Sequence, residues 1–149
     1  MKNYTLQRDL GNYGARWGCY ATAIINIVEN EINRKLTEHE IFAVIGVWHK
    51  SGSIYIANYH NHNAPLERGN NWDQKNDPEW HFLVGNPDNA LLDVFYAINK
   101  TPVTKKAKYK IVLYEIGHYC LNIGLDVINP DPSINIKGVK IIESINMGV

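Results

Sequence analysis

The sequence predicts a single α+β domain in which helices precede an antiparallel sheet. Apolar residues recur at helical spacing in the first two thirds of the chain, whereas the last third consists of β-branched and aromatic runs separated by turn residues. No repeat, low-complexity tract or linker interrupts the 149 residues. Helices and strands that are segregated along a chain are typical of the α+β class. We therefore expect one domain that spans residues 1–149.

The composition excludes several classes of function. The 15 lysines and arginines are balanced by 15 acidic residues, so the formal net charge is zero. Nucleic-acid binders usually carry a basic excess, and we expect no nucleic-acid partner. No segment approaches the roughly 20 apolar residues of a membrane helix or resembles a signal peptide, which predicts no membrane span and synthesis in the cytoplasm. The two cysteines are too few for a disulfide scaffold.

Three helices are predicted, each from its own local signal. Helix 19–31 follows from five apolar residues at helical spacing, namely Tyr20, Ala23, Ile24, Ile27 and Val28. Helix 38–48 follows from a capping box, because Thr37 precedes Glu40 by three residues at the start of an apolar run. Helix 89–99 follows from a third amphipathic pattern.

The segment 49–80 is polar, aromatic and rich in turn residues, and we expect a long ordered loop with one short strand near 54–56. A loop of this length is uncommon in a domain unless it forms a binding surface or a lid. Tyr59, Trp72 and Trp80 are therefore predicted to line a substrate cleft. The alternative interpretation is that these aromatic side chains pack the loop onto the domain.

The last third of the chain predicts a meander of four strands. The runs 108–116, 118–123, 126–129 and 139–145 are β-branched or aromatic. Glycines and an Asn-Pro-Asp-Pro turn at 129–132 separate them.

Cys19 is the candidate nucleophile because it stands at the first turn of the first predicted helix. Backbone N–H groups and the positive end of the helix dipole stabilise a thiolate, so we expect the pKa of this thiol to be lowered. The alternative is a small buried hydrophobic residue, as free cysteines often are.

His118 is the favoured base, because it begins a strand directly after a glycine, and His81 is its competitor. The pair His60 and His62 has the spacing of metal ligands. No further ligands follow at a recognisable spacing, so neither a metal nor another cofactor is predicted.

Strand register selects the residue that would orient His118. A two-residue turn at 124–125 places His118 directly opposite Asp131, on one face of the sheet. Asn129 then falls on the same face, two positions from the imidazole. Asp131 is the first choice as the acceptor for the imidazole N–H, with Asn129 in reserve. Asp131 has the alternative interpretation of an ordinary turn residue.

The order of these motifs resembles the papain-like cysteine peptidases of the bacteriocin-leader (double-glycine) type. Gln7-Arg8-Asp9 precedes Gly18-Cys19 at the start of an alanine-containing helix. Gly117-His118 follows a predicted strand, and an apolar run then closes in Asp131-Pro132. The resemblance extends over nearly the whole chain.

This resemblance implies a papain-like fold and a role for each matching residue. Cys19 matches the nucleophile, His118 the general base and acid, and Asp131 the orienting acid, with Asn129 as the alternative. Gln7 matches the side chain that stabilises the oxyanion together with the Cys19 backbone N–H. Gln7 also has the alternative interpretation of an ordinary surface residue.

The same fold and residue order occur in peptidoglycan hydrolases of the CHAP and NlpC types, including phage endolysins. The hypothesis is therefore a cysteine amidase or endopeptidase for peptidoglycan stem peptides, which reaches the cell wall after release by another protein. One alternative is a protease that acts on a protein or leader peptide. Another is a catalytically silent module of this fold that binds a peptide or glycan.

Overall fold

The computed structural model describes residues 3–10, 18–58, 80–102 and 108–148. Helices come first along the chain and strands dominate the last third, so the predicted α+β class is confirmed. The helices are η1 (Gln7–Leu10), α2 (Cys19–Ile32), α3 (Glu38–Ser51) and α5 (Pro87–Ala97). The strands are β1 (Ile54–Asn58), β2 (Trp80–Val84), β3 (Tyr109–Tyr114), β4 (His118–Ile123), β5 (Asp126–Ile128) and β6 (Ile141–Met147).

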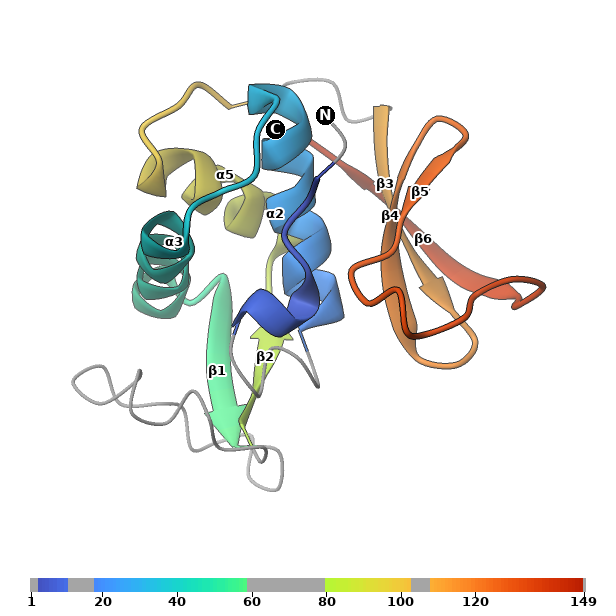
Figure 1. The fold of residues 1–149 in the computed structure, drawn as a ribbon. Coiled ribbons are helices and arrows are strands. Elements are labelled where there is room, and N and C mark those ends of the chain that lie inside the picture. The colour runs from blue at the N-terminus through green and yellow to red at the C-terminus, as the bar shows by residue number, and fades with distance from the viewer. Residues whose placement is uncertain (1–2, 11–17, 59–79, 103–107, 149) are drawn as a thin grey trace.

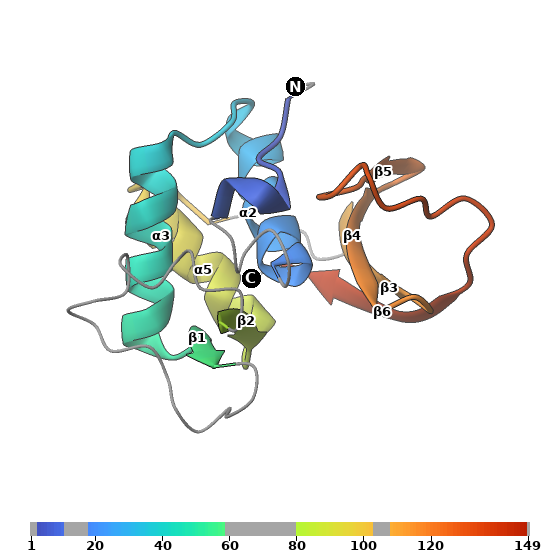
Figure 2. The same ribbon diagram turned by 60° about the horizontal axis from the view of Figure 1, so that its bottom comes forward.

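Helix α2 lies at the centre of the molecule. Figure 1 shows α3 and α5 on one side of it and the four-stranded sheet on the other. Every residue from 21 to 29 is buried, which is typical of a core helix that is covered on all its faces. Figure 2 shows the sheet curving beside α2, on the side away from α3. The N-terminal end of α2, where Cys19 stands, is therefore held between the helical layer and the sheet.

The four-stranded sheet is antiparallel throughout, in the order β5-β4-β3-β6. The predicted meander is wrong in one respect, because β6 pairs with β3 and not with β5. The connection from 129 to 140 crosses one face of the sheet, where Ile136 and Val139 pack on Val112, Tyr114 and Cys120. Burial of these apolar side chains favours the return to the open edge of β3. The result is the strand order of a Greek key.

The helix boundaries follow from local capping. The Thr37 hydroxyl accepts a hydrogen bond from the Glu40 N–H at 3.1 Å, and the Glu40 carboxylate accepts one from the Thr37 N–H at 3.0 Å, as predicted. Arg34 donates to both carboxylate oxygens of Glu40 at 2.7 and 2.8 Å and lowers its pKa to about 2. Helix α5 begins two residues earlier than predicted, because Asn86 caps it and Pro87 fits the first helical turn.

A two-stranded sheet lies at the end of α3. The short strand expected near 54–56 is present as β1, and β2 pairs with it from Ile54 and Val84 to Asn58 and Trp80. Strand β2 was not predicted, because a short apolar run of five residues shows no period that separates a strand from a helix.

The Glu29 carboxylate is fully buried on α2 and has no cation against it among the described residues. It accepts four hydrogen bonds. One oxygen accepts from the Thr5 N–H (2.9 Å) and the Asn26 amide (3.0 Å), and the other from the Thr5 hydroxyl (2.6 Å) and the Leu36 N–H (2.7 Å). Burial raises the pKa of this carboxyl, and the four donors act in the opposite direction. These bonds tie the segment before η1 to the central helix.

We expect Glu29→Gln to lower the free energy of unfolding by about 1–3 kcal/mol. Each carboxylate oxygen accepts a backbone N–H, from Thr5 or from Leu36, so either orientation of the new amide places an NH₂ group against an N–H donor. Urea denaturation at pH 7 measures the change. Glu143→Gln is the matched control, because Glu143 is exposed on β6. Equal stability of the two variants would contradict this account of the carboxylate.

Candidate active site

The Cys19 thiol lies at the N-terminus of α2 and is only partly exposed. Burial raises its pKa, and this outweighs the opposing effect of backbone N–H groups from Tyr119, Tyr20 and Cys19 itself. The prediction of a lowered pKa for the Cys19 thiol is therefore wrong. The predicted N–H donors are present, but the loss of water around the sulfur has the larger effect.

Packing of α2 on β4 brings the thiol to the strand that begins with His118. The Tyr20 and Tyr119 rings pack against each other with centroids 4.4 Å apart and planes tilted by 40°. The Tyr119 N–H, which acts on the Cys19 sulfur, belongs to the residue directly after His118. The sequence separation of about 100 residues is thus closed by a contact between one helix end and one strand end.

The His118 side chain is 3% exposed, and its Nε2 atom lies 2.8 Å from Oδ1 of Asn129. Two further bonds determine which atom of the Asn129 amide faces the ring. Its Nδ2 donates to the Ile134 carbonyl at 2.9 Å, and its Oδ1 also accepts from the Asp131 N–H at 3.0 Å. Because Oδ1 is an acceptor, Nε2 carries the proton of this bond. A neutral His118 ring therefore has its lone pair on Nδ1.

The register that predicted Asp131 opposite His118 does not extend that far. The turn at 124–125 and the first pair, Ile123 with Asp126, are as predicted, but pairing ends at Leu121 and Ile128. Asn129 turns the chain through its bond to the Asp131 N–H, and Pro130 has no N–H for the ladder. The position of Asn129 is opposite Cys120 in the expected pairing, and its side chain reaches His118, two residues away on the neighbouring strand.

Asp131 makes no hydrogen bond to the imidazole. Its Oδ1 accepts from the Ser133 N–H at 3.1 Å and from the Ser133 hydroxyl at 2.6 Å. This is a second side-chain turn, directly after the one at Asn129. The acceptor for His118 is thus Asn129, the second choice in the sequence analysis. Asp131 has the geometry of an ordinary turn residue, which was its alternative interpretation.

Gln7 is 3% exposed, and its backbone N–H donates to the Pro130 carbonyl at 2.8 Å. The interpretation as an ordinary surface residue is therefore wrong. The bond joins η1 to the residue that follows Asn129, and Thr5, two residues before Gln7, is held by the buried Glu29. The structure thus brings the backbone of Gln7 to the segment that orients His118.

Cys19 and His118 are not hydrogen-bonded to each other within the described residues. Catalytic hydrogen bonds are often long in unliganded enzymes and shorten when substrate binds. Cys120 is fully buried in a cluster with Val112 and Tyr114, and burial raises its pKa to about 12.

The remaining candidates lie in parts of the chain that the structure does not describe. Tyr59, Trp72, His60 and His62 fall within 59–79, outside the described residues. Trp80 and His81 belong to β2, but their side chains are also outside the description. Among the residues described, no three His, Cys, Asp or Glu side chains form a metal site, and no helix has the length and hydropathy of a membrane span.

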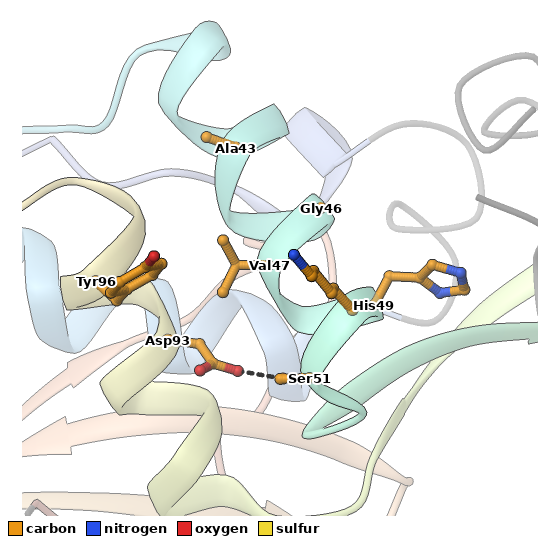
Figure 3. Close-up of a pocket in the computed structure, with 8 residues that line it drawn as sticks. Ala43, Gly46, Val47, His49, Ser51, Asp93 and Tyr96 are labelled. Atoms are coloured by element: carbon orange, nitrogen blue, oxygen red, sulfur yellow. Dashed lines mark hydrogen bonds between the residues drawn. The ribbon is translucent and has the colours of Figure 1, made fainter. Parts of the chain in front are cut away.

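A hollow of about 870 Å³ lies between α3 and α5, and no signal in the sequence points to it. Figure 3 shows Tyr96 and Val47 on its two sides, while the His49 ring points away. The Asp93 carboxylate closes one end and accepts hydrogen bonds from the hydroxyls of Ser51 (2.5 Å) and Ser53 (2.6 Å). These bonds give the Asp93 carboxylate a structural role, because they tie the end of α3 to α5.

Comparison of the chain with protein-family models, with curated proteins and with solved structures finds no match.

The two thiols differ in a way that alkylation measures. Because burial raises the pKa of Cys19, its rate of reaction with iodoacetamide should still be increasing above pH 8.5, the ordinary value for a cysteine. Cys120 is fully buried and should stay unlabelled to about pH 10. Mass spectrometry of peptides from the wild type and from Cys19→Ala assigns the label. A rate for Cys19 that reaches its plateau below pH 7 would contradict the raised pKa.

Proposed function

We propose that this protein is a cysteine hydrolase that cleaves amide bonds, with Cys19 as nucleophile and His118 as general base and acid. The observation that carries the proposal is the bond from His118 Nε2 to the Asn129 amide, on the strand end against which the Cys19 thiol packs. This bond leaves Nδ1 as the proton acceptor of a neutral ring. A thiol, a base and an orienting group are the three parts that nucleophilic catalysis requires.

The support for Asn129 extends beyond a single contact. One hydrogen bond is enough to satisfy a buried imidazole nitrogen. Here the acceptor is itself held by two more bonds, to the Ile134 carbonyl and from the Asp131 N–H, so the ring is oriented by a rigid group. Such secondary support is typical of side chains whose direction matters for chemistry.

The proposed reaction begins with transfer of the thiol proton to Nδ1 of His118 as the sulfur attacks the substrate carbonyl carbon. The carbonyl oxygen becomes an oxyanion, stabilised by the Cys19 N–H and the Gln7 side chain. His118 then gives its proton to the leaving amine, the C–N bond breaks and a thioester remains. Water, deprotonated by His118, attacks the thioester and releases the carboxylic acid and the free thiol. The raised thiol pKa favours this order, in which the proton leaves during the attack.

The proposed substrate is a peptidoglycan stem peptide, and its support is the resemblance of the sequence motifs to cell-wall hydrolases. The net charge of zero provides no strong long-range attraction to an anionic envelope. Recognition would therefore depend on contacts within the cleft. The order of the elements supports the proposed papain-like arrangement, because a central helix that begins with Cys19 is followed by an antiparallel sheet.

Digestion of purified bacterial sacculi, and separately of a mixed peptide library, tests the proposal, with products identified by mass spectrometry. We expect the wild type to release stem-peptide fragments and Cys19→Ala to release none. Cys120→Ala is the matched control and should retain activity, because Cys120 lies in the core. Cleavage of the library alone would favour a protease that acts on proteins. Cleavage of neither substrate would count against a hydrolase and favour a binding module.

The orienting role separates Asn129 from Asp131. We expect Asn129→Ala to lower kcat by about 10²-fold, within the range that general acid–base catalysis contributes. Asn129→Asp keeps an acceptor for Nε2 and should restore part of the rate. Asp131→Asn should change kcat much less, because Asp131 does not contact the ring. Thermal unfolding of each variant shows whether the turn persists. A larger loss in Asp131→Asn than in Asn129→Ala would reverse the assignment.

A further inference from the structure

A hollow of about 380 Å³ lies beside the proposed active site. Its lining residues are Leu6, Arg8, Pro130, Asp131, Pro132 and Ser133. One wall consists of Leu6 and Arg8, the neighbours of Gln7 in the chain, and the other consists of residues 130–133, which follow Asn129. The hydrogen bond from the Gln7 N–H to the Pro130 carbonyl joins the two walls. Each wall therefore continues from a residue that the proposed function uses.

Hydrogen bonds join the hollow to the orienting group of the proposed site. The Asp131 N–H donates to Oδ1 of Asn129 at 3.0 Å, and the same oxygen lies 2.8 Å from Nε2 of His118. Because Asp131 lines the hollow, this wall lies one hydrogen bond away from the amide that holds the imidazole. A peptide with its scissile bond beside His118 can therefore place a neighbouring side chain in the hollow.

Arg8 is the cationic group of this hollow. It is exposed and forms no ion pair among the described residues. The neighbouring carboxylate of Asp9 is already engaged by the Leu6 N–H (2.8 Å) and the Lys35 ammonium (3.3 Å). Asp131 has one oxygen occupied by Ser133. The guanidinium therefore retains donors for a carboxylate, which it can bind in a bidentate manner.

We propose that this hollow is a substrate subsite for a residue with a free carboxylate close to the scissile amide bond, and that Arg8 recognises it. The inference rests on the proposed function for the position of the scissile bond. A volume of about 380 Å³ falls within the roughly 300–1,000 Å³ typical of ligand sites. Asp131 repels a carboxylate from its own side and so directs that group toward Arg8.

A positional-scanning library of quenched fluorescent hexapeptides tests the subsite through Glu and Gln substitutions at each position. At one position next to the cleaved bond, we expect the wild type to have a kcat/KM about tenfold higher for Glu than for Gln, as a charge-assisted hydrogen bond predicts. Arg8→Gln should bring this ratio close to one, and Arg8→Lys should retain part of it. Lys140→Gln removes an exposed positive charge outside the hollow and should keep the wild-type ratio.

A binding experiment separates this inference from the proposed function. NMR titration of Cys19→Ser with N-acetylglutamate amide and with N-acetylglutamine amide measures recognition without turnover. We expect shifts at Arg8 with the glutamate probe only, which disappear in Cys19→Ser/Arg8→Gln. Cleavage with no Glu preference at any position would overturn the subsite and leave the hydrolase proposal standing. Arg8-dependent binding without cleavage of either the hexapeptides or the sacculi would overturn the hydrolase and retain the carboxylate site. Equal responses to both probes would overturn the subsite.

Discussion

The burial of α2 on all its faces is the constraint on which the rest of the structure depends. A helix that packs against α5, η1 and a sheet loses water over residues 21–29, so each polar side chain in that stretch needs an internal partner. Glu29 finds its partners in Thr5, Asn26 and Leu36, and this requirement holds the N-terminal segment against the helix. The position of η1, and with it Gln7, follows from satisfying one buried carboxylate.

The same burial determines the chemistry of Cys19. The end of a helix supplies N–H donors that favour a thiolate, but α2 is packed so closely on β4 that dehydration of the sulfur dominates. The thiol is therefore held in its protonated form beside the strand that begins with His118. In the proposed reaction the proton moves as the bond to the substrate forms, and the orientation of His118 matters more than a preformed ion pair.

Two consecutive side-chain turns place the Asn129 amide against His118. In the Asn-Pro-Asp-Pro segment, Asn129 accepts from the Asp131 N–H, and Asp131 accepts from Ser133. Proline removes the N–H that would continue the ladder, so the strand ends and the Asn129 amide is directed at His118. The turn also forms one wall of the hollow that contains Arg8. Ring orientation and the proposed substrate selectivity thus share one short segment.

Local chemistry by itself determined α2, α3 and the turn between β4 and β5. The capping box at Thr37 and Glu40, the spacing of apolar residues after Cys19 and the glycine turn at 124–125 act within a few residues, and the structure agrees with each. Tertiary structure decided what depends on distant partners. The pairing of β6 with β3, the strand β2, the raised pKa of Cys19 and the choice of Asn129 over Asp131 as the partner of His118 all arise from packing or from where a ladder stops. Periodicity reports which face of a segment is buried, but burial depth and strand ends are properties of the assembled core.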